Sequence, residues 1–194
     1  TDVDDKDITL NSSNAITGAL TFTTQTGGSN GADITLNNGS TAISLAGFTA
    51  RGSLTLESTD AIALTANVIN GDLSVTSNGA ITQSGALTVS GNSSFTSTGT
   101  DTNITLALAN AFTGPVTLTT AGTSGDVSID NNTTALGIQG TINGGLTVRN
   151  GAAITDSGTL TVSGTSSFTI DAGSNHITLG SAALTGAIGV STSG

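Results

Sequence analysis

The chain has 194 residues, a formal net charge of −10 and no cysteine, methionine, tryptophan or tyrosine. Its only cations, Lys6, Arg51 and Arg149, stand against 13 acidic residues. So few cations cannot displace counterions from a phosphate backbone, so nucleic acid is excluded as a partner. The lack of cysteine excludes disulfides and thiolate metal sites, and no run of 18 apolar residues is present to span a membrane.

The apolar residues favour a regular core. They make up 35% of the chain and are nearly all Ile, Leu, Val and Ala, with five Phe. A mean hydropathy of +0.19 argues against a disordered chain, although Gly, Ser and Asn are abundant. Without large aromatic and thioether side chains to fill irregular space, the composition favours uniform layers over an irregular globular interior.

One short motif recurs along the chain, an apolar residue, then Thr or Ser, then a second apolar residue. Alternation with a period of two predicts a strand with one buried and one wet face, and the frequent Gly excludes helices. The copies begin at residues 8, 20, 34, 43, 54, 73, 87, 104, 116, 127, 146, 160 and 177.

Six Asn-Gly pairs lie between these strands. Both residue types tolerate positive φ, so each pair is expected to turn a sharp corner. The pairs are Asn30-Gly31, Asn38-Gly39, Asn70-Gly71, Asn78-Gly79, Asn143-Gly144 and Asn150-Gly151.

A longer repeat contains the short one. Residues 79–106 match residues 152–179 at a shift of 73, with 17 of 28 identical, and a weaker match relates 7–21 to 103–117 at a shift of 96. The difference suggests one additional structural unit near 58–79. The first match predicts that Phe95 and Phe168 occupy corresponding places in different coils.

The fold class that these patterns predict is all-β, a right-handed parallel β-helix (β-solenoid) of roughly eight or nine coils. An antiparallel sandwich also uses Asn-Gly turns, but its strands run longer and are spaced more evenly. Right-handedness follows from the preference of parallel crossover connections. We expect residues 1–194 to form a single solenoid segment of a longer rod, or a unit that stacks end to end, because neither end of the sequence looks like a cap.

Candidate catalytic groups do not form a recognisable site in the sequence. The single histidine, His176, matches Asn103 of the earlier copy, which indicates a solvated corner. A glycan lyase or hydrolase needs clustered acids together with cations, but Arg51 and Arg149 do not align across the repeat, and the acids are spaced singly at corners. We therefore expect no enzymatic activity and no cofactor. The acids in question are Asp126, Asp130, Asp156 and Asp171.

The acidic start of the chain is a weak candidate for Ca²⁺, which prefers oxygen ligands. It lacks the glycine and the distal Glu of an EF-hand loop, so a frayed acidic terminus is the favoured interpretation. The residues concerned are Asp2, Asp4, Asp5 and Asp7.

Outward threonines raise an ice-binding alternative, because a flat face with Thr-x-Thr on every coil can order water. Across all the triplets the second outward position is mixed and includes Glu57, Ala107 and Arg149. The β-propensity of Thr on an exposed face explains its abundance more simply.

Three segments carry a resemblance to the repeat regions of filamentous-haemagglutinin-like adhesins, including two-partner-secretion exoproteins and giant biofilm adhesins of Gram-negative bacteria. They are Gly-Ala-Leu-Thr-Val-Ser-Gly (85–91), Gly-Thr-Leu-Thr-Val-Ser-Gly (158–164) and Gly-Ala-Ile-Thr-Gln-Ser-Gly (79–85). The family's amino-terminal secretion motif is absent, and no family site residue transfers.

The resemblance implies a stalk or filament segment of a secreted adhesin or matrix fibre, located outside the cell or on the bacterial surface. Its expected partners are neighbouring repeats of the same rod, a second copy stacked end to end, or polysaccharide, without insertion into a membrane. A carbohydrate-binding face and an ice-binding solenoid stay open as alternatives.

Overall fold

The computed structural model describes residues 6–24 and 31–193, and within them it contains three stacks of parallel strands and no helix. No described segment can therefore cross a bilayer as a helix. Sheet A, the first stack, contains in spatial order β1 (Ile8–Leu10), β3 (Ile34–Asn37), β6 (Leu54–Ser58), β9 (Leu73–Ser77), β12 (Ser93–Thr100), β15 (Val116–Ala121), β17 (Leu136–Ile142), β19 (Ile154–Val162) and β21 (Ile177–Thr178), with β22 (Ala182–Leu184) also paired to β19.

The other two stacks complete each coil. Sheet B contains β2 (Ala19–Leu20), β4 (Ile43–Leu45), β7 (Ile62–Leu64), β10 (Ile81–Gln83), β13 (Ile104–Leu106), β16 (Val127–Asp130), β18 (Leu146–Asn150), β20 (Ser166–Ile170) and β23 (Ile188–Thr192). Sheet C is shorter and contains β5 (Thr49–Ala50), β8 (Val68–Ile69), β11 (Thr88–Val89) and β14 (Ala111–Phe112).

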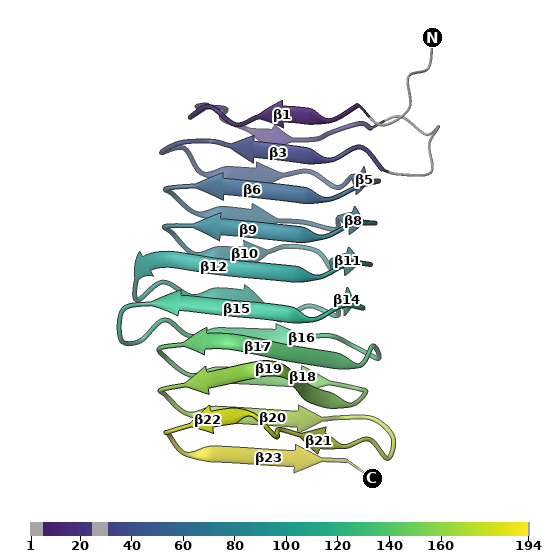
Figure 1. Cartoon of the computed structure of the whole chain (residues 1–194), viewed down its shortest axis with the longest axis vertical. Coiled ribbons are helices and arrows are strands. Elements are labelled where there is room, and N and C mark those ends of the chain that lie inside the picture. The colour runs from purple at the N-terminus through teal and green to yellow at the C-terminus, as the bar shows by residue number, and fades with distance from the viewer. Residues whose placement is uncertain (1–5, 25–30, 194) are drawn as a thin grey trace.

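The chain visits sheets A, B and, in the first half, C in turn, and then returns to sheet A one coil further on. Strand pairs β6–β9, β10–β13 and β18–β20 are parallel, as are all the other pairings among the described strands. Figure 1 shows the near strands running one way and the far strands the other as the chain descends, which makes a right-handed coil. The predicted right-handed β-solenoid is confirmed, with about eight turns.

The core consists of columns of like side chains, one per strand position. On sheet B, Ile43, Ile62, Ile81 and Ile104 follow one another in register, and all four are buried. The alternation of the triplets produces this arrangement, because every second side chain of a strand points inward. Successive coils stack in register, so each inward aliphatic group meets its counterpart above and below.

The 73-residue repeat does not correspond to a whole number of coils. Three full turns separate β12 from β19 within sheet A, and β20 then follows in sheet B. Phe95 of β12 and Phe168 of β20 are both buried, but they line opposite sheets. The prediction that they share corresponding places in the stack is therefore wrong, because the repeat spans three and a half coils and exchanges the two long sheets.

A change in strand type accommodates this exchange. Sheet C ends at β14, and the residues equivalent to β8 and β11, at 141–142 and 161–162, form the last parts of β17 and β19 in sheet A. Both strands bend where they pair, and their register shifts between Ile138 and Gly140. Sheet A thus combines one long strand per coil in the first repeat with a bent double strand in the second.

Buried asparagines close several corners. Asn131 accepts a hydrogen bond from Phe112 N at 2.7 Å, and its amide group donates to the carbonyls of Phe112, Thr134 and Ala135. Asn38 makes the same four contacts with residues 16, 41 and 42. Of the described Asn-Gly glycines only Gly39 has a positive φ, of 56°, so most of these pairs turn without the left-handed conformation that their composition suggested.

Replacing Gly140 with Ala should destabilise the rod by about 1–3 kcal/mol. Gly140 has φ +122°, and an added Cβ would lie 2.1 Å from the backbone oxygen of Leu118 on the neighbouring strand. Urea unfolding monitored by circular dichroism measures the change. Gly189→Ala is the control, because that glycine also lies within a strand but its Cβ would have no neighbour closer than 4.0 Å. Equal unfolding midpoints for the two variants would contradict the conclusion that the backbone at Gly140 requires glycine.

Candidate functional site

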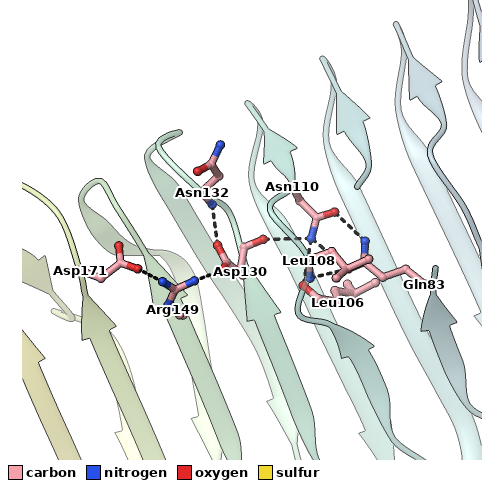
Figure 2. Close-up of polar contacts among 8 residues, drawn as sticks. All are labelled: Gln83, Leu106, Leu108, Asn110, Asp130, Asn132, Arg149 and Asp171. Atoms are coloured by element: carbon pink, nitrogen blue, oxygen red, sulfur yellow. Dashed lines mark hydrogen bonds and ion pairs between the residues drawn. The ribbon is translucent and has the colours of Figure 1, made fainter. Parts of the chain in front are cut away.

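A row of polar side chains crosses five successive coils at the end of the sheet B strands (Figure 2). It begins with Gln83 at the end of β10 and Asn110 before β14, whose amide groups pair reciprocally at 2.9 and 3.1 Å. Asn110 is fully buried and also donates to the carbonyls of Leu106 and Asp130, each at 2.9 Å. These bonds satisfy polar groups that the corner would otherwise leave unpaired.

The row continues as a charged cluster centred on Arg149. Its guanidinium group contacts Asp130 at 2.9 Å on one side and Asp171 on the other, so it links three coils (Figure 2). The Asp130 side chain is 9% exposed, and its second oxygen accepts a hydrogen bond from Asn132 N at 2.7 Å. Two carboxylates neutralise the one arginine, so the cluster offers no surplus positive charge to hold an anionic ligand.

The sequence spacing predicts that the four acids stand singly at corners, and for two of them the structure shows otherwise. Asp130 and Asp171 are brought together by Arg149. Asp126 and Asp156 instead tie one coil to the next, by accepting hydrogen bonds from Gly145 N at 2.6 Å and from Ser181 N respectively. Arg51 lies outside the cluster, at the exposed corner before β6.

His176 lies at an exposed corner, in accord with the prediction from its match to Asn103. Its contact in the stack is through the backbone, since its carbonyl oxygen accepts a hydrogen bond from Ile154 N at 3.0 Å.

Of the proposed calcium ligands, Asp2, Asp4 and Asp5 lie outside the described residues. Asp7 is exposed, and its carboxylate accepts a hydrogen bond from Asp33 N at 3.0 Å. Among the residues that are described, no three carboxylate or histidine groups gather closely enough to hold a metal ion.

A groove of about 750 Å³ crosses the beginning of five sheet B strands, from β13 to β23. Its floor carries the outward residues Thr105, Ser128, Thr147 and Ser167, which follow one another in register. Hydroxyl groups both donate and accept hydrogen bonds, so this floor suits an uncharged polyhydroxylated ligand better than an ionic one.

A loop between β15 and β16 borders the groove with Thr123 and Ser124. Asp101, one coil earlier, fastens this loop by accepting hydrogen bonds from Thr123 N at 2.7 Å and Ser124 N at 2.9 Å. These two backbone bonds stabilise the carboxylate and hold the pKa of Asp101 below its usual value of 3.8. Asp101 itself adopts φ 58°, a conformation that Asp and Asn tolerate better than other non-glycine residues.

Sequence reasoning missed the groove and the Gln83–Asn110 pair. Both depend on which residues meet across coils, and the coil length varies along the chain. The available signal was the shared outward Thr or Ser in the triplets starting at 104, 127 and 146, but the same signal occurs in triplets of the other long sheet.

Lowering the pH through the depressed pKa of Asp101 should release the loop at 123–124. Because the folded pKa lies below the unfolded one, the contribution of this group to stability is present above the unfolded pKa and is lost as the pH falls through the folded pKa. NMR titration of the Asp101 carboxyl and amide exchange at Thr123 and Ser124 measure both events. Asp101→Asn keeps an acceptor and should protect these amides, whereas Asp101→Gly should expose them. Equal exchange in the two variants would refute the anchoring role.

Comparison with known proteins identifies the repeat but no activity. No curated protein matches the chain, and no solved structure matches it. A family described as repeats of unknown function (DUF5649) matches residues 51–119 and 124–191, two segments that begin 73 residues apart, at the spacing found within the sequence. Since these matches cover more than half of its length, the chain belongs to this family of repeats, DUF5649.

Proposed function

We propose that the chain is a structural rod segment of a secreted bacterial surface adhesin or extracellular matrix fibre, and that it holds more distal parts away from the cell. The observation that carries this proposal is the single parallel ladder of sheet A, which runs through both family repeats without interruption. A chain that stacks coil on coil converts sequence length directly into rod length.

The composition supports a location outside the cell. Without cysteine, no disulfide has to form during or after export, and the resemblance to filamentous-haemagglutinin-like adhesins points the same way. Activity as an enzyme is not part of the proposal. The arginine of the only charged cluster across coils in the described chain is already neutralised, and His176 lies apart from that cluster.

The partner that we propose is a further coil of the same kind, either from a neighbouring repeat or from a second copy. Strand β23 continues the inner columns of sheet B, with Val190 in register with Phe168. Ile188 and Val190 are 54% and 62% exposed, and a further stacked coil would cover both.

A tandem protein with two copies of residues 1–194 tests the rod. If the coils stack continuously, electron microscopy should show a thin rod longer than that of the single copy by about 40 Å, since stacked strands lie about 4.8 Å apart. Gly140→Ala in one copy is the matched control, because it should disturb the stack locally. Two compact beads joined by a flexible link would rule out the stalk function.

The sheet B groove supports a second candidate function, the binding of a neutral polysaccharide. Hydroxyl groups line its floor on four successive strands, and the net charge of −10 disfavours acidic glycans.

Thr147→Tyr should abolish binding to neutral glycans on an array, because the ring would fill the middle of the groove. The matched control is Ser74→Tyr, which changes the residue 73 positions earlier, on sheet A and outside the groove. Tyr is well tolerated on exposed strands, so both variants should fold. If the unmodified chain binds no neutral glycan, the groove has no such role.

A further inference from the structure

An unbroken column of threonines lies on the outer face of sheet A. The backbone register pairs Thr76 with Thr96, Thr96 with Thr119, Thr119 with Thr141, and Thr141 with Thr161. Five consecutive coils thus present the same side chain at the same place. This column becomes visible only when the strands are assigned to sheets. Across all the triplets in the sequence, the second outward position is mixed.

A second column of hydroxyl groups runs beside the first. Thr35, Thr55, Ser74, Ser94 and Thr117 follow one another in register, two residues before the first column where both are present. Within the described structure, the five threonine hydroxyls of the first column form no hydrogen bond with protein. In the second column only Thr117 is engaged, by Gln139 Nε2 at 3.0 Å.

The family repeat accounts for the column of threonines only in part. Thr76 and Thr96 belong to the first family match, whereas Thr141 and Thr161 belong to the second, in strand segments equivalent to β8 and β11 of sheet C. The residue 73 positions after Thr76 is Arg149, on the opposite sheet. At other positions the repeat keeps the residue, since Thr96 corresponds to Thr169 on sheet B and Thr161 corresponds to Thr88 on sheet C. The column on sheet A therefore combines threonines that the repeat retains with threonines that it does not.

Four of the five strands that carry the column, β9, β12, β15 and β17, have no ionisable residue, although the protein has 13 acidic residues. The fifth, β19, contains Asp156. Glu57 precedes the column on one side, and Ala183 follows it on the other. The exposed charges of sheet B, such as Arg149, lie on the other long side of the coil.

On β9, β12 and β15, where both columns are present, the outward hydroxyl groups form a two-dimensional lattice. Hydroxyl groups repeat about every 4.8 Å along the stack and about 6.6 Å along each strand, and Figure 1 shows the strands of sheet A aligned one above another. Both repeats are close to spacings between water molecules in ice. A periodic face complements a periodic surface. Crystalline polysaccharide is less suitable, because all five Phe are buried or partly buried and no exposed ring can stack on sugars.

We infer that the outer face of sheet A binds the surface of ice crystals through its threonine lattice. Each hydroxyl donates and accepts a hydrogen bond, while each methyl group fills the space between ordered water molecules. This activity goes beyond the proposed stalk function and does not depend on it.

Thermal hysteresis of the 194-residue chain is the direct test, together with its partitioning into a slowly growing ice hemisphere. The chain should open a gap between freezing and melting points and should enter the ice. Thr96→Tyr and Thr119→Tyr should each remove most of this gap, because a ring at the centre of the face keeps the lattice away from the ice. Thr96→Val, which deletes only the hydroxyl, should reduce the gap less.

The matched control is Thr169→Tyr, since Thr169 lies 73 residues after Thr96 on sheet B, outside both the threonine column and the groove. This variant should keep the full gap, and circular dichroism at 4 °C should show unchanged β-structure in all four variants. No hysteresis in the unmodified chain, equal losses in Thr96→Tyr and Thr169→Tyr, or binding to crystalline cellulose in place of ice would each overturn the inference. Rod length is measured separately by electron microscopy. A failure of the ice-binding inference therefore does not count against the stalk proposal.

Discussion

The rest of the structure depends on the parallel hydrogen-bond ladder between successive coils. Because each strand pairs only with the strands one coil before and one coil after it, every side chain meets its own counterparts along the stack. Like must then pack on like, which accounts for the interchangeable Ile, Leu and Val of the inner columns. Polar groups at the corners are satisfied in the same direction, as when Asp126 accepts from Gly145 N and Asn131 pairs with Phe112.

A repeat of three and a half coils is compatible with this ladder because the inward positions of the two long sheets accept the same kinds of side chain. Phe95 and Phe168 can line opposite sheets, since each requires only an aliphatic column and a small inward neighbour, Ser93 or Ser166. The outer faces are equivalent only in part. Repeat-related positions hold threonine on both sheets at Thr96 and Thr169, but Thr76 on sheet A corresponds to Arg149 on sheet B.

The sequence was sufficient to predict strands, parallel stacking and corners, because period-two triplets and Asn-Gly pairs are local signals. It could not assign a triplet to a sheet, since Leu73-Ser74-Val75 and Leu146-Thr147-Val148 share the same alternation yet lie in sheets A and B. The Asp130–Arg149–Asp171 cluster escaped prediction for a related reason. Its members are 19 and 22 residues apart, and only the observed coil lengths bring them together.

Inward side chains are constrained by the stack and outward side chains are not, which explains how the faces of one rod can differ in chemistry. Inner side chains such as Ile81 and Ile104 are buried between neighbouring coils, and a change there disturbs the ladder on both sides. Outward threonines such as Thr96 contribute mainly β-propensity, which many residues can supply. Selection can therefore act on one face without altering the stack. For this reason a column of threonines on sheet A and a hydroxyl-lined groove on sheet B can coexist within the same eight turns.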